Sequence, residues 1–247
     1  MVRYGIIVLA VLLLAVACGC WLNKNNRSSL NATTDKQKQE GMYTYLALGD
    51  SYTIGEAVPM AENFPHQVTE LLKQQNFDVA APVIVAKTGW TTDELAMAIR
   101  EHNITDSFSF VTLLIGVNNQ YRGRDLANYK DEFVQLLDQA LAFANGHRDK
   151  VFVVSIPDWG VTPFADGRNR EQIAKEIDEY NNAAKEISSH YKCHYLDITE
   201  STRHNGNNAL FLAEDKLHPS GKEYAVWAAK LAPVIARSLK GSLEAVE

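Results

Sequence analysis

Short apolar runs alternate with longer amphipathic segments along most of this 247-residue chain. Each run has the length of a buried strand, and the runs lie at 45–48, 79–86, 108–115, 151–156 and 194–198. Strands that alternate with helices pair in parallel through right-handed crossovers, and the helices cover both faces of the sheet. We therefore predict one three-layer α/β domain with a doubly wound parallel sheet of about five strands.

The segments between the runs carry apolar residues at helical spacing. They predict helices at 64–75, from Thr91 or Thr92 to 102, at 126–144, around 173–187 and at 221–239. Pro82 interrupts the run 79–86, so we expect that strand at an edge of the sheet. The segment 157–169 is rich in proline, glycine and aspartate, and it forms either a lid over a site or an ordinary surface loop.

The first residues form a separate unit. Arg3 precedes an apolar stretch at 6–17, which is too short for a helix that crosses a bilayer core of about 30 Å and is typical of a secretory signal. The ending Leu14-Ala-Val-Ala-Cys18 resembles a bacterial lipobox, which implies cleavage before Cys18 and lipidation of its thiol. A plain signal peptide with an incidental cysteine is the alternative.

Residues 23–41 are almost without apolar side chains and predict a flexible tether. The expected organisation is a signal peptide at 1–17, a lipidated cysteine and tether at 18–41, a globular domain at 42–240 and a tail at 241–247. These features predict a lipid-anchored protein of the bacterial cell envelope, outside the cytoplasm. The sequence leaves the membrane leaflet and the oligomeric state open.

Composition excludes several classes of protein. A net charge of -6 argues against nucleic acid as a partner, because a phosphate-binding surface is basic. Beyond Cys18, the chain has only Cys20 and Cys193, which is no disulfide framework, and no Cys/His spacing is typical of zinc. We expect Cys193 to be a small buried residue and not a nucleophile.

Polar residues follow the predicted strands. Ser51 comes directly after the first strand, Gly89 after the second and Asn118 after the third. The carboxyl ends of parallel strands lie at one edge of a sheet, where such folds bind ligands. We therefore expect these residues to lie close together, although Asp50-Ser51 also suits a helix cap and Gly89 a simple turn.

A serine needs a base, and the base needs a carboxylate that orients it. Asp215 and His218 stand three residues apart, so one turn can carry both toward Ser51. A tetrahedral intermediate also needs hydrogen-bond donors, which a backbone N–H beside Gly89 and the Asn118 amide could supply. A simpler reading of His218-Pro219 is the start of a helix.

Gly49-Asp-Ser51, Gly89, Gly116-Val-Asn118 and Asp215-Lys-Leu-His218 together resemble the signature blocks of the SGNH, or GDSL-type, hydrolases. The resemblance extends from Tyr43 to Leu239 and implies a flavodoxin-like sheet and ester hydrolysis through an acyl-enzyme. It implies Ser51 as the nucleophile, His218 as the general base and then acid, and Asp215 as its orienting carboxylate. It further implies an oxyanion hole of the Ser51 and Gly89 backbone N–H groups and the Asn118 side chain, with no metal or organic cofactor.

Two positions depart from the family pattern. Tyr52 stands where the family has leucine, and Asn119 stands where aspartate is frequent. We expect contacts with the substrate from residues beside the signature blocks: Tyr52, Trp90, Asn119, Tyr121 and Arg122. For Trp90 a place in the core is an equal alternative, and for Tyr121 and Arg122 a solvated loop.

The sequence as a whole predicts a serine esterase that removes short acyl groups, such as acetyl, from carbohydrates. A lipase or lysophospholipase with the same triad is the first alternative. A binding lipoprotein that has kept the fold without the activity is the second, but it would have no need of all five site residues.

Overall fold

The computed structural model describes residues 42–244, so Cys18, Cys20 and the predicted signal peptide and tether lie outside the described residues. The fold is built on one five-stranded sheet with the order β2-β1-β3-β4-β5, and every pair of neighbouring strands is parallel. The strands are β1 (Tyr45–Asp50), β2 (Val83–Lys87), β3 (Phe110–Leu114), β4 (Val151–Val154) and β5 (His194–Leu196). The predicted α/β class and doubly wound parallel sheet are confirmed.

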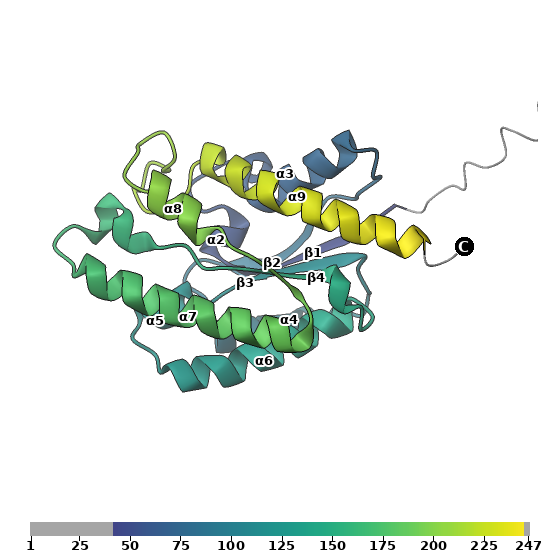
Figure 1. Ribbon diagram of the computed structural model, residues 1–247, viewed down its shortest axis with the longest axis horizontal. Coiled ribbons are helices and arrows are strands. Elements are labelled where there is room, and N and C mark those ends of the chain that lie inside the picture. Colours follow the sequence, from purple (N-terminus) through teal and green to yellow (C-terminus); the bar gives the residue numbers. More distant parts are fainter. Residues whose placement is uncertain (1–41, 245–247) are drawn as a thin grey trace, which may run out of the picture. The chain divides into compact units, whose positions relative to one another are not determined.

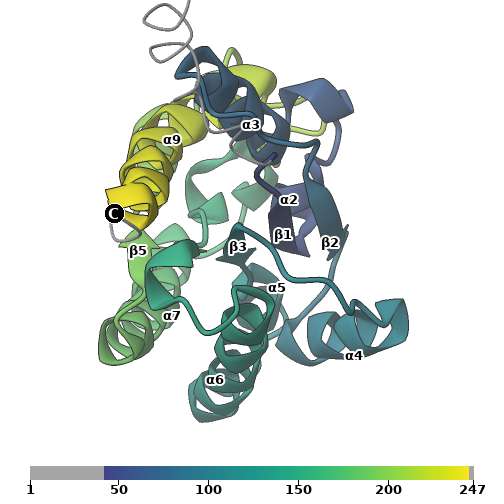
Figure 2. The same ribbon diagram turned by 90° about the vertical axis from the view of Figure 1, so that its right-hand side faces the viewer.

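Helices cover both faces of the sheet. Figures 1 and 2 show α3 (Phe64–Gln74) and α9 (Gly221–Glu244) on one face, and α4 (Thr92–His102), α6 (Leu126–Phe143) and α7 (Arg170–Tyr191) on the other. β1, β3 and β4 are buried along their whole length, because helices lie above and below them. Their near-continuous apolar sequences follow from this double burial.

The remaining elements are short. They are α2 (Ser51–Ile54), α5 (Val117–Tyr121), α8 (Thr199–Asn205) and the 3₁₀ turns η1 (Met60–Glu62), η2 (Arg148–Lys150), η3 (Trp159–Val161) and η4 (Pro163–Ala165). Among them, α2, α5, α8 and η3 begin in the segments that follow strands. None of these short elements was predicted, because three to seven residues are too few to show a helical period.

The second strand differs from its prediction. β2 is an edge strand, as expected, but it begins at Val83, directly after Pro82, instead of at residue 79. Val79 forms only an isolated bridge with Tyr43. Proline has no N–H for the ladder, so the ordered pairing with β1 starts beyond it.

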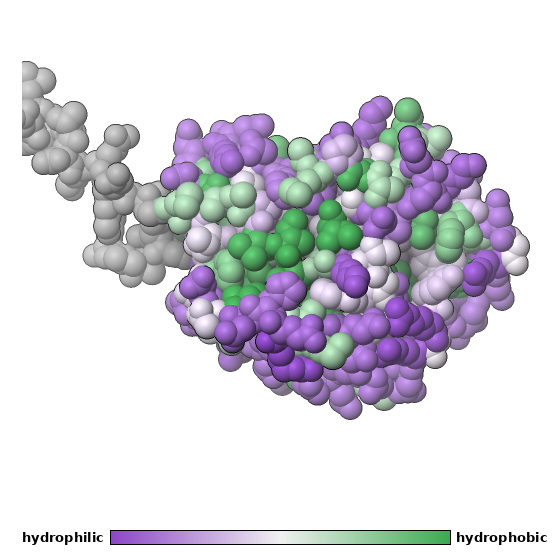
Figure 3. Space-filling view, turned by 180° about the vertical axis from the view of Figure 1, so that it is seen from behind, coloured by the Kyte–Doolittle hydropathy of each residue, from purple (hydrophilic) through white to green (hydrophobic). Residues whose placement is uncertain are grey.

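Apolar side chains remain exposed along this edge. Val83 of β2 is 45% exposed and Met97 of α4 is 49% exposed. Figure 3 shows the rear face of the molecule, on which β2 and α4 lie at the right of Figure 2. Apolar residues form a patch on this face. Within residues 42–244, no helix combines the length and apolar character needed to cross a membrane.

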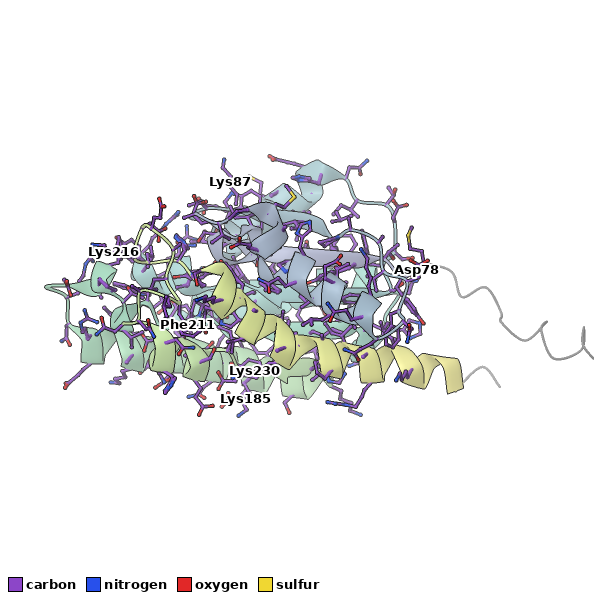
Figure 4. All side chains as sticks on the ribbon, turned by 90° about the horizontal axis from the view of Figure 1, so that it is seen from above. Asp78, Lys87, Lys185, Phe211, Lys216 and Lys230 are labelled. Carbon is purple, nitrogen blue, oxygen red and sulfur yellow. The ribbon has the colours of Figure 1, made fainter. Side chains whose placement is uncertain are left out.

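The loop before α9 returns to the carboxyl edge of the sheet. Figure 4 shows Lys216 and Phe211 of this loop at one end of the molecule, and Asp78, which precedes β2, at the opposite end. The segment 215–218 thereby lies with the residues that follow β1, β2 and β3. The carboxyl edge is the region where the predicted site residues meet.

Candidate active site

Ser51 stands at the first position of α2, immediately after β1. The Asp50 side chain caps this short helix by accepting the N–H of Tyr52 at 3.0 Å, and Gly55 ends it with a φ of 77°. Gly49 is required just before the turn, because a Cβ there would lie 2.1 Å from Thr53 Oγ1 and 2.4 Å from the Leu114 carbonyl oxygen. The bare glycine lets the turn close against β3.

His218 connects Ser51 to Asp215. The distance from Ser51 Oγ to His218 Nε2 is 2.9 Å, and the distance from His218 Nδ1 to Asp215 Oδ2 is 2.5 Å. A carboxylate against Nδ1 places the ring proton on that nitrogen and leaves Nε2 free to accept the serine proton. The expected Ser-His-Asp chain of contacts is therefore present, across 167 positions of sequence.

The turn 215–218 holds the carboxylate as well as the histidine. Asp215 Oδ1 accepts the backbone N–H groups of Leu217 at 3.0 Å and His218 at 2.9 Å. Partial burial by itself would raise the pKa of Asp215, but the hydrogen bonds from the His218 side chain and from these two N–H groups outweigh burial and lower the pKa. Asp215 is therefore ionised near neutral pH.

The ring of Tyr52 packs against the base. Its centroid lies 5.0 Å from that of His218 and 6.4 Å from that of Trp227, and the side chain is only 4% exposed. Tyr52 also lines the pocket at Ser51. The residue that replaces the family leucine thus restricts the imidazole from one side.

The residues expected to supply the oxyanion hole lie together in one pocket. Ser51, Gly89 and Asn118 line one pocket, and Gly89 has a φ of 85°, which side-chain-bearing residues rarely adopt. Asn118 Nδ2 donates to the Trp90 carbonyl oxygen at 3.0 Å and lies 3.4 Å from Asp50 Oδ2. Both amide hydrogens therefore have acceptors within the protein, and the longer contact with Asp50 is the one that a substrate oxygen in the pocket would replace.

Asp50 is completely buried beneath these donors. Burial raises the pKa of this carboxyl to about 7, although hydrogen bonds from the Tyr52 N–H and the Asn118 amide act in the opposite direction. Its role is to form the turn, because both carboxylate oxygens face inward to Tyr52 and Asn118 and the residue does not line the pocket.

An aromatic wall closes one side of the pocket, whose cavity volume is about 170 Å³. Tyr121 and Phe164 are 44% and 42% exposed, and Trp159 lies behind them with its ring centroid 5.3 Å from that of Tyr121. The Arg168 guanidinium covers Tyr121 at 5.5 Å from its ring centroid. The wall combines α5 with the loop 157–169.

The loop residues Trp159 and Phe164 were not predicted as site residues. Their loop follows β4 at the same edge of the sheet as Ser51, and this position was the available signal. The sequence predicts the segment 157–169 either as a lid or as a surface loop. In the structure this segment lies against the pocket, and Thr88, Val117 and Leu217 complete the lining.

Three predicted contact residues lie elsewhere. Asn119 is fully buried and binds Thr92, accepting its N–H at 3.1 Å and donating to its hydroxyl at 2.6 Å, so it does not reach the pocket. Trp90 is partly buried, packs against the hydrophobic core and does not line the pocket. Arg122 faces Gly89 and Glu94 and is not part of the pocket lining.

Cys193 is the free cysteine of the described residues. It is partly buried, and burial raises the pKa of its thiol to about 11, so the thiol is protonated near neutral pH and a poor nucleophile. The described part of the chain has no group of three or more His, Cys, Asp or Glu side chains placed to hold a metal ion.

A family model for GDSL-like lipases and acylhydrolases matches residues 47–226. The chain belongs to this family. It is therefore a hydrolase of carboxylic esters, and the match includes Ser51, Gly89, Asn118, Asp215 and His218. No curated protein matches the sequence.

Solved structures of the family share the fold at low sequence identity. The structure of TesA aligns with a TM-score of 0.63 and 15% identity over 79% of this chain and 99% of that one. A lipase/acylhydrolase from Enterococcus faecalis aligns at 0.59 and 20%, over 81% and 97% of the two chains. The acetylxylan esterase Axe2 from Geobacillus stearothermophilus aligns at 0.59 and 18%, over 80% and 94%.

Proposed function

We propose that this esterase removes short acyl groups, such as acetyl, from carbohydrates through an acyl-enzyme on Ser51. The observation that carries the proposal is the chain of contacts from Ser51 through His218 to Asp215, at 2.9 and 2.5 Å. Ser51 Oγ attacks the ester carbonyl carbon while Nε2 of His218 takes its proton. The same proton then passes to the departing alcohol oxygen as the carbon–oxygen bond breaks.

Deacylation repeats these steps with water. His218 removes a proton from water, the hydroxide oxygen bonds to the acyl carbon, and the Ser51 oxygen leaves with the proton from His218. In both tetrahedral intermediates the negative oxygen accepts from the Ser51 N–H, the Gly89 N–H and the second hydrogen of Asn118 Nδ2. Asp215 stays ionised and stabilises the imidazolium that forms between the two transfers.

The aromatic wall supports a short acyl group on a sugar. Exposed aromatic faces such as those of Tyr121 and Phe164 stack on the C–H faces of pyranose rings. The acetylxylan esterase among the structures of similar fold is consistent with this substrate class.

The first test is hydrolysis of p-nitrophenyl esters from acetate to palmitate by the full chain. We expect the highest kcat/KM for acetate, a decline with acyl length, and no turnover by Ser51→Ala. Activity that rises with acyl length would favour a lipase or lysophospholipase instead. Undiminished turnover by Ser51→Ala would contradict the nucleophile assignment.

We further propose that Cys18 carries a lipid that holds the enzyme in the bacterial cell envelope, outside the cytoplasm. The support is the charged start, the apolar stretch 6–17 and the small residues before Cys18. In cells fed radioactive palmitate, the protein should become labelled and enter the detergent phase. A Cys18→Ser variant that is labelled equally well would contradict the proposal.

A further inference from the structure

The turn that carries Gly89 is held by three side chains, one from the segment after α2 and two from the segment after β3. Its backbone closes through the Trp90 N–H, which donates to the Lys87 carbonyl oxygen at 3.2 Å. The Thr88 hydroxyl binds the carboxylate of Glu56, and the Trp90 carbonyl oxygen accepts from Asn118. Between these two anchors, the Gly89 carbonyl oxygen accepts from Arg122 Nη2 at 2.6 Å.

Arg122 is itself oriented by an ionised carboxylate. Its Nη1 lies 3.3 Å from Glu94 Oε1, and Glu94 Oε2 accepts the Thr91 N–H at 2.9 Å as part of the capping box of α4. Burial raises the pKa of Glu94, but hydrogen bonds from Thr91 and Arg122 outweigh it and lower the pKa. The guanidinium therefore bridges the first turn of α4 and the Gly89 carbonyl.

A glycine at a φ of 85° has little intrinsic preference for that conformation, and its peptide planes can rotate. The hydrogen bond to its carbonyl fixes one of the two planes. That plane carries the Trp90 N–H, and the Gly89 N–H lies in the preceding Thr88–Gly89 plane. Arg122 holds the residue after this second plane and Glu56 holds Thr88 before it. Together the two contacts restrict the rotation that would turn the Gly89 N–H away from Ser51. Oxyanion donors are effective because they are already aimed where the charge develops.

We propose that Arg122 is a positioning residue, which keeps the Gly89 N–H directed into the oxyanion hole without touching the substrate. The proposal rests on the function proposed above for Gly89. It replaces the expectation that Arg122 contacts the substrate, since both ends of the guanidinium already have partners in the protein.

Arg124 provides a matched control. It also comes from the segment after β3 and also pairs with α4, through Asp93 at 2.6 Å, but its side chain has no contact with Gly89. Replacing either arginine by alanine removes the same charge and one ion pair to the same helix. Only Arg122→Ala removes the anchor of the Gly89 turn.

The test measures kcat and KM for p-nitrophenyl acetate with Arg122→Ala, Arg122→Lys and Arg124→Ala in the full chain. For Arg122→Ala we expect kcat to fall by about 10- to 100-fold with KM within about twofold of wild type, because displaced catalytic groups act on the transition state. Arg122→Lys should recover part of kcat, because an ammonium can donate to one carbonyl but cannot bridge to Glu94. Arg124→Ala should keep kcat within about twofold.

Two outcomes would overturn the proposal. A raised KM with unchanged kcat for Arg122→Ala would make Arg122 a substrate-binding residue. An equal loss of kcat in Arg124→Ala would attribute the effect to the ion pairs with α4.

A second measurement is independent of turnover. In ¹H–¹⁵N spectra of the protein, the amide signals of Gly89 and Trp90 should shift or broaden in Arg122→Ala and stay in place in Arg124→Ala. Unchanged signals in Arg122→Ala would refute the positioning role even if the protein is active. Inactivity of the wild type on every ester would instead refute the proposed function, while the spectra would still decide the role of Arg122.

Discussion

Two neighbouring asparagines show how differently adjacent residues are used. Asn118 lies beside the pocket and donates one amide hydrogen to the Trp90 carbonyl at 3.0 Å and the other to Asp50 at 3.4 Å. Asn119 turns inward, is fully buried and binds both the N–H and the hydroxyl of Thr92. Asn118 is placed to donate to a substrate, and Asn119 connects α5 to α4 through its hydrogen bonds with Thr92.

We therefore expect opposite results from the two alanine variants. Asn118→Ala should lower kcat by about 10²–10³, the usual loss for one oxyanion donor. Asn119→Ala leaves the Thr92 N–H without its partner and should lower the free energy of unfolding by about 1–3 kcal/mol. Kinetics and thermal melts of both proteins provide the comparison, and a loss of kcat under about tenfold in Asn118→Ala would mean that its amide is not an oxyanion donor.

Asp50 makes stability depend on pH. Its pKa is about 7 in the folded state, against 3.8 as the ordinary value, so folding favours the protonated form. The resulting contribution to stability is fully present below about pH 3.8 and is lost as pH rises through about 7. Asp50→Asn keeps an oxygen for the Tyr52 N–H but cannot titrate.

The free energy of unfolding of wild type minus that of Asp50→Asn should therefore fall between about pH 4 and about pH 7. Denaturant titrations of both proteins at several pH values measure it. A difference that stays constant over this range would mean that Asp50 is already ionised in the folded protein at the acid end.

At the scale of elements, the shortest helix has the strictest requirements. α2 has only four residues, and it depends on the Asp50 cap and on the absence of a side chain at Gly49. A methyl group at Gly49 would meet Thr53 and the backbone of β3, which cannot move aside without disturbing the centre of the sheet.

Gly49→Ala should lower the free energy of unfolding by about 1–3 kcal/mol or more, as expected for overpacking. Gly241→Ala is the control, because a Cβ at Gly241 meets nothing within 4 Å and alanine suits a helix better than glycine. Thermal melts should show a marked loss for the first variant and none for the second. Equal melting temperatures would mean that β3 and α2 can separate at no cost.

The long elements were predictable from the sequence, and the short ones were not. α3, α4 and α6 agree with the predicted helices to within one residue at each end, because each shows two or more turns of apolar periodicity. α9 continues to Glu244, beyond the expected end at 239, and α7 extends past 173–187 at both ends. α2 and α5 have only four and five residues, which are too few for a local period to reveal.

The residues that meet at Ser51 were predictable because strand order in a parallel sheet places their loops at one edge. The aromatic wall was not predictable from the sequence, because no period or motif marks Trp159 and Phe164. The different directions of Asn118 and Asn119 also follow from tertiary contacts, with Asp50 and Trp90 on one side and Thr92 on the other.

The hydrophobic core and the site that the structure describes are both built from residues 42–244. We expect a chain that starts at Met42 to have the melting temperature and the kcat of the longer protein. Calorimetry and the acetate assay on both proteins test this. A lower melting temperature for the shorter chain would assign a stabilising role to residues 1–41.

The separation of 167 positions between Ser51 and His218 has a consequence for folding. The hydroxyl has no base until α9 has packed against α3 and the loop before it has reached the edge of the sheet, which makes the contact among the most non-local in the chain. A growing or partly folded chain therefore carries Ser51 in an unreactive state. During refolding, esterase activity should return only with the slowest phase, so its recovery reports the last step in which the two ends of the domain come together.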